Sequence, residues 1–239
     1  MRILEGEKVT KHFGGLAAVH GVDFDIDQGE VVGLIGPNGA GKTTLFNLIS
    51  GSLPTTAGEI KYKDKRITGL KPHEICKRGV ARTFQSAKLF AGMTVFENTL
   101  AASLFGSKRA VSVAEAEREA AELLEFVELS AAGSMQARDL SIGNRKRLEV
   151  ARALATKPEL LMFDEVMAGL NPSEIVQAME LIARIRSRGI TIFMIEHVMK
   201  AIMNVCDRII VLHHGRKIAE GTPREIAASR AVVEVYLGE

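Results

Sequence analysis

The sequence predicts an α/β fold with a mainly parallel sheet, and three observations support this prediction. Short apolar runs, which are typical of strands buried on both faces, alternate along the chain with longer segments of helical periodicity. A glycine-rich loop lies between the first of these buried runs and a helix. Polar residues follow three further runs at the point where each run ends, which is where open parallel sheets bind their ligands.

Length and composition fit one large domain, or a domain with a subdomain. The chain has 239 residues, of which 46% are hydrophobic, enough to form a full core. A net charge of +2 gives no reason to expect nucleic acid as a partner. Two cysteines, Cys76 and Cys206, are too few for a disulfide framework and are expected to be reduced thiols. We find neither an apolar signal core at the start nor a run of about 18 apolar residues that could span a membrane.

The first 30 residues predict antiparallel β structure. Val22, Phe24 and Ile26 are each followed by an aspartate, an alternation that suits a strand with one face in water. Phe13 lies in the same region. Its position alone is equally consistent with a packed strand residue and with a functional aromatic.

The glycine-rich loop matches the phosphate-binding pattern G-x-x-x-x-G-K-[ST]. Its residues are Gly36, Pro37, Asn38, Gly39, Ala40, Gly41, Lys42, Thr43 and Thr44. A buried strand is predicted before the loop at residues 31–35, and a helix after it at residues 45–50. Glycines let several backbone N–H groups point at one anion, and the helix N-terminus adds partial positive charge. We therefore predict a P-loop NTPase core in which Lys42 reaches the β- and γ-phosphates of a nucleotide and Thr43 ligates Mg²⁺.

The middle of the chain predicts a helical insertion. Residues 51–79 are rich in turns, with a short strand near 59–62 and a helix near 72–78, and a further strand at 80–84 ends at Gln85. Three helices are expected within an inserted helical subdomain at residues 87–157, near residues 98–104, 114–129 and 145–156. Ser141 is expected to cap the third helix. The run Arg145, Lys146 and Arg147 is expected to be a solvent-exposed face.

The last third of the chain returns to strands and helices in alternation. Strands are predicted at residues 160–163, 190–195 and 208–212, with a helix from Asn171 to Gly189 and a mostly helical tail over 220–239. Residues 1–86 and 158–239 would then form a nucleotide-binding core that includes the antiparallel β part. Together with the insertion they would make a single domain over residues 1–239.

Four polar groups should meet at one edge of the predicted sheet. The P-loop, Gln85, the pair Asp164-Glu165 and His197 each come directly after a strand run, or one residue later. Carboxylate, hydroxyl and amide oxygens suit Mg²⁺, so Asp164 is expected to hold it with Thr43 and Gln85. Glu165 would face the γ-phosphate and deprotonate or orient a water, and His197 would hydrogen-bond that phosphate or water. The expected catalytic residues are Glu165, His197 and Lys42.

With these motifs the chain resembles, over essentially its whole length, the ATPase subunits of ABC transporters. Residues 36–44 match their P-loop, Gln85 their Q-loop, residues 140–144 their signature loop, residues 160–165 their second nucleotide motif, residues 168–171 their D-loop and His197 their switch histidine. The resemblance implies ATP and Mg²⁺ as cofactors, with Phe13 stacked on the adenine ring. It also implies a head-to-tail dimer, with either an identical or a paralogous cassette. There each ATP lies between the P-loop of one subunit and Ser141, Gly143 and Asn144 of the other.

Three positions depart from the family pattern. The signature loop usually has the sequence Leu-Ser-Gly-Gly-Gln, whereas this chain has Ile142 at its third position and Asn144 at its fifth. Asn144 is one methylene shorter than glutamine, which changes its expected contact across the dimer. Val166 stands where proline usually follows the Asp-Glu pair, and we expect little catalytic effect from it.

Finer resemblance is to the branched-chain amino acid importers, and to the first of their two ATPases. It rests on residues 81–85, 93–98, 164–172 and the ending 236–239. It implies integral membrane permeases as partners, which the Gln85 region would move, and indirectly a substrate-binding protein. It also implies a location on the cytoplasmic face of the membrane. Urea or amide importers and a lipopolysaccharide exporter remain alternatives.

Functions outside transport are less well supported by the residues. A soluble ABC ATPase in translation or DNA repair generally carries two cassettes or a long coiled-coil insertion, and neither is present. A GTPase would need an Asn-Lys-x-Asp motif, which does not occur. A P-loop kinase would lack the signature segment. A regulatory ATP sensor would have lost the base, whereas Glu165 and His197 are both present.

Overall fold

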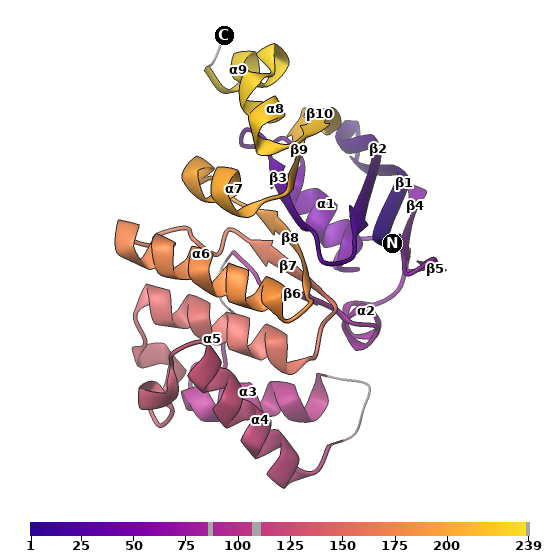
Figure 1. The fold of residues 1–239 in the computed structure, drawn as a ribbon. Helices are drawn as coiled ribbons and strands as arrows, with labels where there is room; N and C mark the ends of the chain where they lie inside the picture. Colours follow the sequence, from indigo (N-terminus) through magenta and orange to yellow (C-terminus); the bar gives the residue numbers. More distant parts are fainter. Residues whose placement is uncertain (86–87, 107–110, 238–239) are drawn as a thin grey trace.

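The computed structural model describes residues 1–85, 88–106 and 111–237 of the chain, and its strands form two sheets (Figure 1). The first sheet has the order β2-β1-β4-β5 and is antiparallel. Its strands are β1 (Arg2–Phe13), β2 (Leu16–Asp27), β4 (Ala57–Tyr62) and β5 (Lys65–Arg66). Burial of alternate residues in β2 confirms the predicted wet face, since Val22, Phe24 and Ile26 are buried.

The second sheet has the order β10-β9-β3-β8-β7-β6, and only the pair β10–β9 is antiparallel. Its strands are β3 (Val31–Ile35), β6 (Val80–Arg82), β7 (Leu160–Asp164), β8 (Thr191–Ile195), β9 (Arg208–His213) and β10 (Arg216–Gly221). Every residue of β3, β7 and β8 is buried, as expected for parallel strands covered on both faces. The predicted α/β fold with a mainly parallel sheet is confirmed.

Two cores lie on opposite faces of the six-stranded sheet. Along β3, Val32 and Leu34 pack into one core, while Val31 and Ile35 pack into the other. The first core contains α1 (Lys42–Ile49), which Figure 1 places between the two sheets. The second core contains side chains from α6 (Pro172–Ser187) and α7 (Met199–Val205). Successive side chains of a strand point to opposite faces of the sheet, so β3, which leads into the P-loop, packs into both cores.

Three helices fill most of the predicted insertion and lie together at one end of the molecule (Figure 1). They are α3 (Val95–Phe105), α4 (Val113–Phe126) and α5 (Ile142–Ala155). Helices α3 and α5 each begin three residues earlier than predicted. Thr94 caps α3 in a capping box with Glu97, and Ser141 caps α5 by accepting the N–H of Asn144 at 3.3 Å. The capping serine was identified from the sequence, but the first helical turn lacks the apolar periodicity on which the predicted boundaries rest.

The remaining helices flank the core. They are α2 (Pro72–Lys77), α8 (Pro223–Ala228) and α9 (Arg230–Leu237), all within predicted helical segments, whereas β10 and α7 were not predicted. Alternate residues of β10 are exposed, and α7 spans only seven residues, so neither has a strong sequence pattern. The predicted boundary at residues 86–87 and the last two residues of the tail lie outside the described part of the chain.

Two expectations from composition also concern the fold. Cys76 and Cys206 are free cysteines, and burial raises the pKa of the Cys206 thiol to about 12. Within the part of the chain that the structure describes, no helix is both long and apolar enough to cross a membrane.

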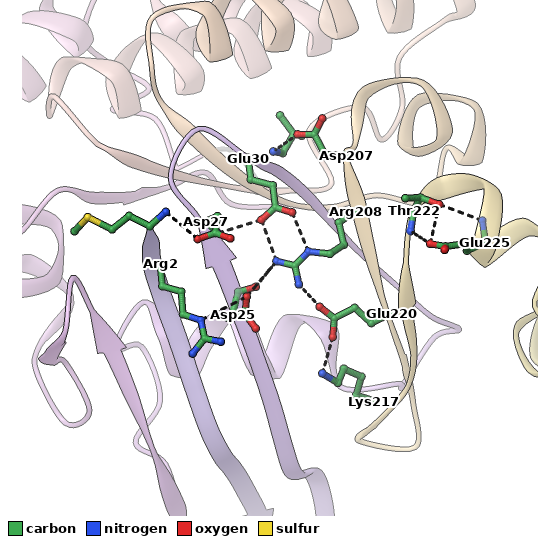
Figure 2. A network of polar contacts seen from close by, with 12 residues as sticks. Arg2, Asp25, Asp27, Glu30, Asp207, Arg208, Lys217, Glu220, Thr222 and Glu225 are labelled. Atoms are coloured by element: carbon green, nitrogen blue, oxygen red, sulfur yellow. Dashed lines mark hydrogen bonds and ion pairs between the residues drawn. The ribbon is translucent and has the colours of Figure 1, made fainter.

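One arginine ties the two sheets together near the start of β3 (Figure 2). Arg208 donates to Glu30 through Nε at 2.8 Å and Nη2 at 2.9 Å, and Nη2 also donates to the carbonyl of Asp25 on β2 at 2.7 Å. Its Nη1 bonds Glu220 of β10. Hydrogen bonding to Glu30 is the main reason why the pKa of this guanidinium is raised. The arginine thereby joins Glu30, just before β3, to β2 of the first sheet and to β10 of the second sheet.

Candidate functional site

The P-loop and three of the predicted polar residues line one cavity of about 600 Å³. Gln85 follows β6, Glu165 follows β7 and His197 lies two residues after β8, so parallel neighbours deliver all three to one edge of the sheet. The described lining of the cavity is Leu16, Ala17, Ala18, Asn38, Gly39, Ala40, Gly41, Lys42, Thr43, Thr44, Gln85, Glu165, His197 and His214. The sequence did not indicate residues 16–18 or His214, because they lie at the beginning of β2 and in the turn after β9, which only the fold brings beside the P-loop.

The P-loop wraps around the ammonium group of Lys42. Lys42 Nζ donates to the carbonyl of Gly36 at 2.6 Å and to that of Pro37 at 3.0 Å. Burial lowers the pKa of Lys42, while the charges of Glu165 and Asp164 act in the opposite direction. Gly41 has a φ of +101°, and a Cβ there would lie 2.4 Å from the carbonyl oxygen of Ala18. Only glycine can therefore join the loop to α1 at this position.

The carboxylate of Glu165 is held at both oxygens. Gln85 Nε2 donates to Glu165 Oε2 at 2.7 Å, and His197 Nε2 lies 2.9 Å from Glu165 Oε1. The sequence predicted that Gln85 and His197 would face Mg²⁺ and the γ-phosphate. In this structure both side chains instead contact Glu165, so the three residues form one hydrogen-bonded unit at the cavity wall. We call Gln85, Glu165 and His197 the carboxylate clamp.

The backbone at Glu165 is in the left-handed region, with a φ of +53°. Such a conformation is unfavourable for a residue with a Cβ, and it persists where surrounding contacts impose it. Its N–H donates to the carbonyl of Ile195 on β8 at 2.9 Å. The turn at the end of β7 is therefore tied to the neighbouring strand.

Asp164 is buried and paired with an arginine that the sequence did not single out. Arg82 Nη2 donates to Asp164 Oδ2 at 2.7 Å, and Nη1 donates to Asn47 at 2.7 Å and to Ser50 at 2.9 Å. Asp164 is 2% exposed, and its Oδ1 has no hydrogen-bond partner among the described residues. Buried carboxylate oxygens are normally bonded. An unpartnered anionic oxygen beside the P-loop helix fits a magnesium ligand, although Asp164 does not itself line the cavity as described.

Lys146 corrects an expectation about the helix after the signature loop. The run Arg145, Lys146 and Arg147 was expected to face solvent, but Lys146 is only 8% exposed. Its Nζ donates to the carbonyls of Gln85 at 2.8 Å and Glu165 at 3.3 Å. Successive helical residues point about 100° apart, so three in a row cannot share one face. Here α5 packs on two sides, and the middle cation points at the cavity wall.

Glu196 is a further buried titratable residue beside the clamp. It is 2% exposed and accepts the N–H of Met167 at 2.8 Å. Burial raises the pKa of Glu196 to about 7, against the lowering effect of the N–H groups of Met167 and His197. The sequence shows Glu196 only as a neighbour of His197, and its burial is a result of packing.

The raised pKa of Glu196 predicts a pH-dependent stability. Because the folded pKa lies above its ordinary value of 4.5, the protonated carboxyl favours folding. That contribution is complete below pH 4.5 and is lost as the pH rises through about 7. We expect wild type to lose on the order of 1–3 kcal/mol of unfolding free energy relative to Glu196→Gln between pH 5 and pH 8.

Urea unfolding of both proteins at four pH values between 5 and 8 measures this difference. Glu180→Gln, which alters an exposed carboxylate on α6, is the matched control and should leave the pH profile as in wild type. Parallel profiles for wild type and Glu196→Gln would show that Glu196 has an ordinary pKa.

The signature residues are not part of the described cavity lining. Ser141 is exposed at the N-terminus of α5, and Ile142 beside it is 59% exposed. Gly143 is buried against α6, where an added Cβ would lie 2.6 Å from Glu174 Oε1. Asn144 is partly buried on the next turn of the same surface. A single chain thus does not bring its own signature loop to its own P-loop.

Phe13 is placed at the rim of the fold and not in a core. It is 47% exposed at the end of β1, and Lys11 Nζ lies 5.1 Å from the centre of its ring. Leu16, three residues later and 67% exposed, belongs to the cavity lining, whereas Phe13 does not. An exposed aromatic ring near the cavity is consistent with base stacking, and the alternative of a packed strand residue is wrong.

Comparison with known proteins agrees with this geometry. The family model described as ABC transporter matches residues 19–168, and that of the branched-chain amino acid ATP-binding cassette transporter matches residues 216–239. The chain is 44% identical over 250 residues to the high-affinity branched-chain amino acid transport ATP-binding protein LivG of Escherichia coli K12. It is 42% identical to the corresponding protein BraF of Pseudomonas aeruginosa, and both alignments cover 99% of this chain and 98% of the relative.

Solved structures show the same fold. The ADP conformation of MJ1267, an ATP-binding cassette of an ABC transporter, superposes with a TM-score of 0.90 at 35% identity and full coverage of both chains. The dimeric cassette MJ0796 in a post-hydrolysis state with ADP and Pi gives 0.84 at 27% identity, over 93% of this chain and 99% of that one. The P-loop, the clamped carboxylate and these matches lead to one conclusion: the chain belongs to the ABC transporter family, as one of its ATP-hydrolysing cassettes.

Proposed function

We propose that this cassette powers an importer of branched-chain amino acids, working as one half of an ATP-sandwiching dimer. The observation that carries the dimer is the separation of the two nucleotide-binding elements within one chain. The P-loop lines the cavity, while Ser141, Gly143 and Asn144 lie at the beginning of α5, outside the described lining of that cavity. A second cassette in head-to-tail orientation would supply its own signature helix, whose N-terminus is an anion site, to this P-loop.

The residues of the cavity have different roles in ATP hydrolysis. Backbone N–H groups of the P-loop and the Lys42 ammonium bind the phosphates and stabilise charge on the transferring phosphoryl group. Glu165 accepts a proton from the attacking water, and His197 and Gln85 hold its carboxylate. Phe13 would stack on the adenine. Once nucleotide is bound, one of the two clamp contacts can be exchanged for the γ-phosphate or the water.

Three oxygen donors fit a magnesium ion at this site. Thr43 and Gln85 line the cavity, and the buried Asp164 Oδ1 has no partner among the described residues. Magnesium prefers such hard oxygen ligands together with phosphate oxygens and water. When bound, it would neutralise charge developing on the phosphates. Arg82 orients the Asp164 carboxylate for that role through its hydrogen bond to Oδ2.

The groove beside Gln85 supports a separate membrane permease as partner. A cavity of about 340 Å³ lies between α2, β6 and α5, and its lining includes Phe84, Lys88, Glu149 and Arg152. Glu149 accepts the N–H of Phe84 at 2.8 Å, so this wall is joined to the segment that carries Gln85. A permease segment bound in this groove would be displaced when the clamp moves. The cassette would then work on the cytoplasmic face of the membrane.

The assignment of branched-chain amino acids as the cargo rests on the relatives and on the C-terminal match, because no residue of a cassette needs to contact the cargo. The relatives LivG and BraF are named for that transport, and the match over residues 216–239 is to the same kind of transporter. Urea or amide import by a similar assembly is the second candidate.

Uptake by cells from which this chain has been deleted tests the proposal. Labelled leucine, isoleucine and valine uptake should fall, and the wild-type chain should restore it while Glu165→Gln does not. Loss of urea uptake with normal leucine uptake would favour the second candidate. Co-purification of the tagged chain with integral membrane proteins should accompany either result, and co-purification with ribosomes instead would contradict a transport role.

A further inference from the structure

We propose that Lys146 is a positioning residue that holds Glu165 in its left-handed turn and thereby sets the geometry of the carboxylate clamp. This inference deepens the proposed function, since it rests on Glu165 as the base. Lys146 lies four residues after the beginning of α5, on the helix whose N-terminus carries the signature loop. It is the one member of the basic run on that helix that points toward the cavity wall, as its hydrogen bonds show.

The first argument is the contact set of the ammonium group. Its Nζ donates to the carbonyl oxygens of Gln85 at 2.8 Å and Glu165 at 3.3 Å. These are the backbone groups of two members of the clamp, on segments 80 positions apart in sequence. A buried ammonium is costly unless its hydrogens are used, so the contacts are strong constraints on both backbones. One side chain therefore fixes the spacing between the base and the glutamine that holds it.

The second argument is the strain at Glu165. Its φ of +53° needs support from outside the residue. The turn is tied at four points. The N–H of Glu165 donates to Ile195 at 2.9 Å, its carbonyl accepts from Lys146 at 3.3 Å and from the N–H of Ala168 at 3.2 Å, and the N–H of Met167 donates to Glu196 at 2.8 Å. Without Lys146, the Glu165 carbonyl keeps only the local hydrogen bond from Ala168 and loses its tie to α5, so the turn can relax toward an ordinary conformation. The carboxylate would then move relative to the attacking water.

Substitution of Lys146 by methionine tests the proposal, because it keeps the length and apolar stem but removes the donors. We expect kcat for ATP hydrolysis, measured in the dimer that this cassette forms or assembles into, to fall about 10- to 100-fold. ATP binding should stay within about twofold of wild type, since the P-loop is untouched. Lys146→Arg should recover most of the activity. If Lys146→Met fails to fold, Lys146→Gln, which keeps an amide donor, takes its place with the same expected direction.

Arg147→Met is the matched control on the same helix. Arg147 donates to the carbonyl of Val127 at 3.3 Å and to Gln177 at 2.7 Å, and neither group belongs to the cavity. We expect it to leave kcat unchanged. Hydrogen–deuterium exchange of the peptide containing residues 165–167 should be faster in Lys146→Met and unchanged in Arg147→Met, a readout that needs no turnover.

The double variant separates positioning from a general structural role. If Lys146 acts through Glu165, then Lys146→Met should cause no further loss of single-turnover rate in a Glu165→Gln background. A further loss of the same size in that background, wild-type kcat in Lys146→Met, or equal losses in Lys146→Met and Arg147→Met would each overturn the inference. Undiminished turnover by Glu165→Gln alone would instead remove Glu165 as the base, and with it the proposed mechanism.

Discussion

Glu165→Gln should bind ATP with wild-type affinity and hydrolyse it about 10²–10⁴-fold more slowly. Glutamine keeps the shape of the side chain and can still meet Gln85 and His197, which hold the carboxylate at 2.7 and 2.9 Å. It cannot accept a proton from water at neutral pH. Single-turnover hydrolysis and equilibrium binding of ATP, measured with and without Mg²⁺, separate the two effects. ATP binding without turnover should also favour the closed dimer, visible as a concentration-dependent increase in mass.

A matched acidic residue provides the control for this prediction. Glu159→Gln changes an exposed carboxylate just before β7, which forms an ion pair with Lys63 on the surface. Its hydrolysis rate should equal that of wild type, because surface ion pairs contribute little to stability and this one is outside the cavity. Substantial steady turnover by Glu165→Gln would exclude Glu165 as the base. The role would then pass to another group that can reach the water.

Ser141→Arg is expected to abolish hydrolysis while leaving ATP binding at the P-loop of the same chain intact. The serine lies exposed at the N-terminus of α5, outside the described cavity lining. In the proposed dimer it faces the nucleotide of the other subunit, so a long cation there blocks closure. Removing one preorganised phosphate contact costs about 10²–10³-fold in rate, and steric blockage should cost at least as much. Equilibrium titration with ATP tests whether binding is intact, and an assay at high protein concentration tests whether hydrolysis is lost.

Mixing two inactive variants tests whether two copies of this chain build the site. Lys42→Ala lacks a working P-loop, and Ser141→Arg lacks a working signature loop. Random pairing of equal amounts gives half heterodimers, each with one intact site, so about a quarter of wild-type activity should return. Recovery would establish a composite homodimer. No recovery from folded variants would assign the second half of the site to a paralogous cassette.

Ser141→Arg also removes the N-cap of α5, and this separate effect on stability has its own control. Ser112 caps α4 as Ser141 caps α5, by accepting the N–H of Glu115 at 3.2 Å. Ser112→Ala should lower stability by about 1 kcal/mol without changing the hydrolysis rate. An equal loss of activity in Ser112→Ala would mean that Ser141→Arg acts by destabilising the helical subdomain.

The sequence by itself determined the α/β class and the local motifs. Continuous apolar runs predicted β3, β7 and β8, because strands buried on both faces need no polar alternation. A parallel sheet places the carboxyl ends of such strands at one edge, so the convergence of the P-loop, Gln85, Glu165 and His197 was predictable. These features depend on the composition of short segments and on rules of strand connection.

Only the tertiary structure decided which charged side chains are buried and what they contact. Nothing in the local pattern distinguishes Lys146 from its exposed neighbour Arg145, or identifies Arg82 as the partner of Asp164 across 82 positions of sequence. Burial of a charge depends on how distant elements pack around it, and a hydrogen bond needs a match of a few tenths of an ångström. The sequence therefore determined which chemistry this protein carries, and packing determined how that chemistry is held in place.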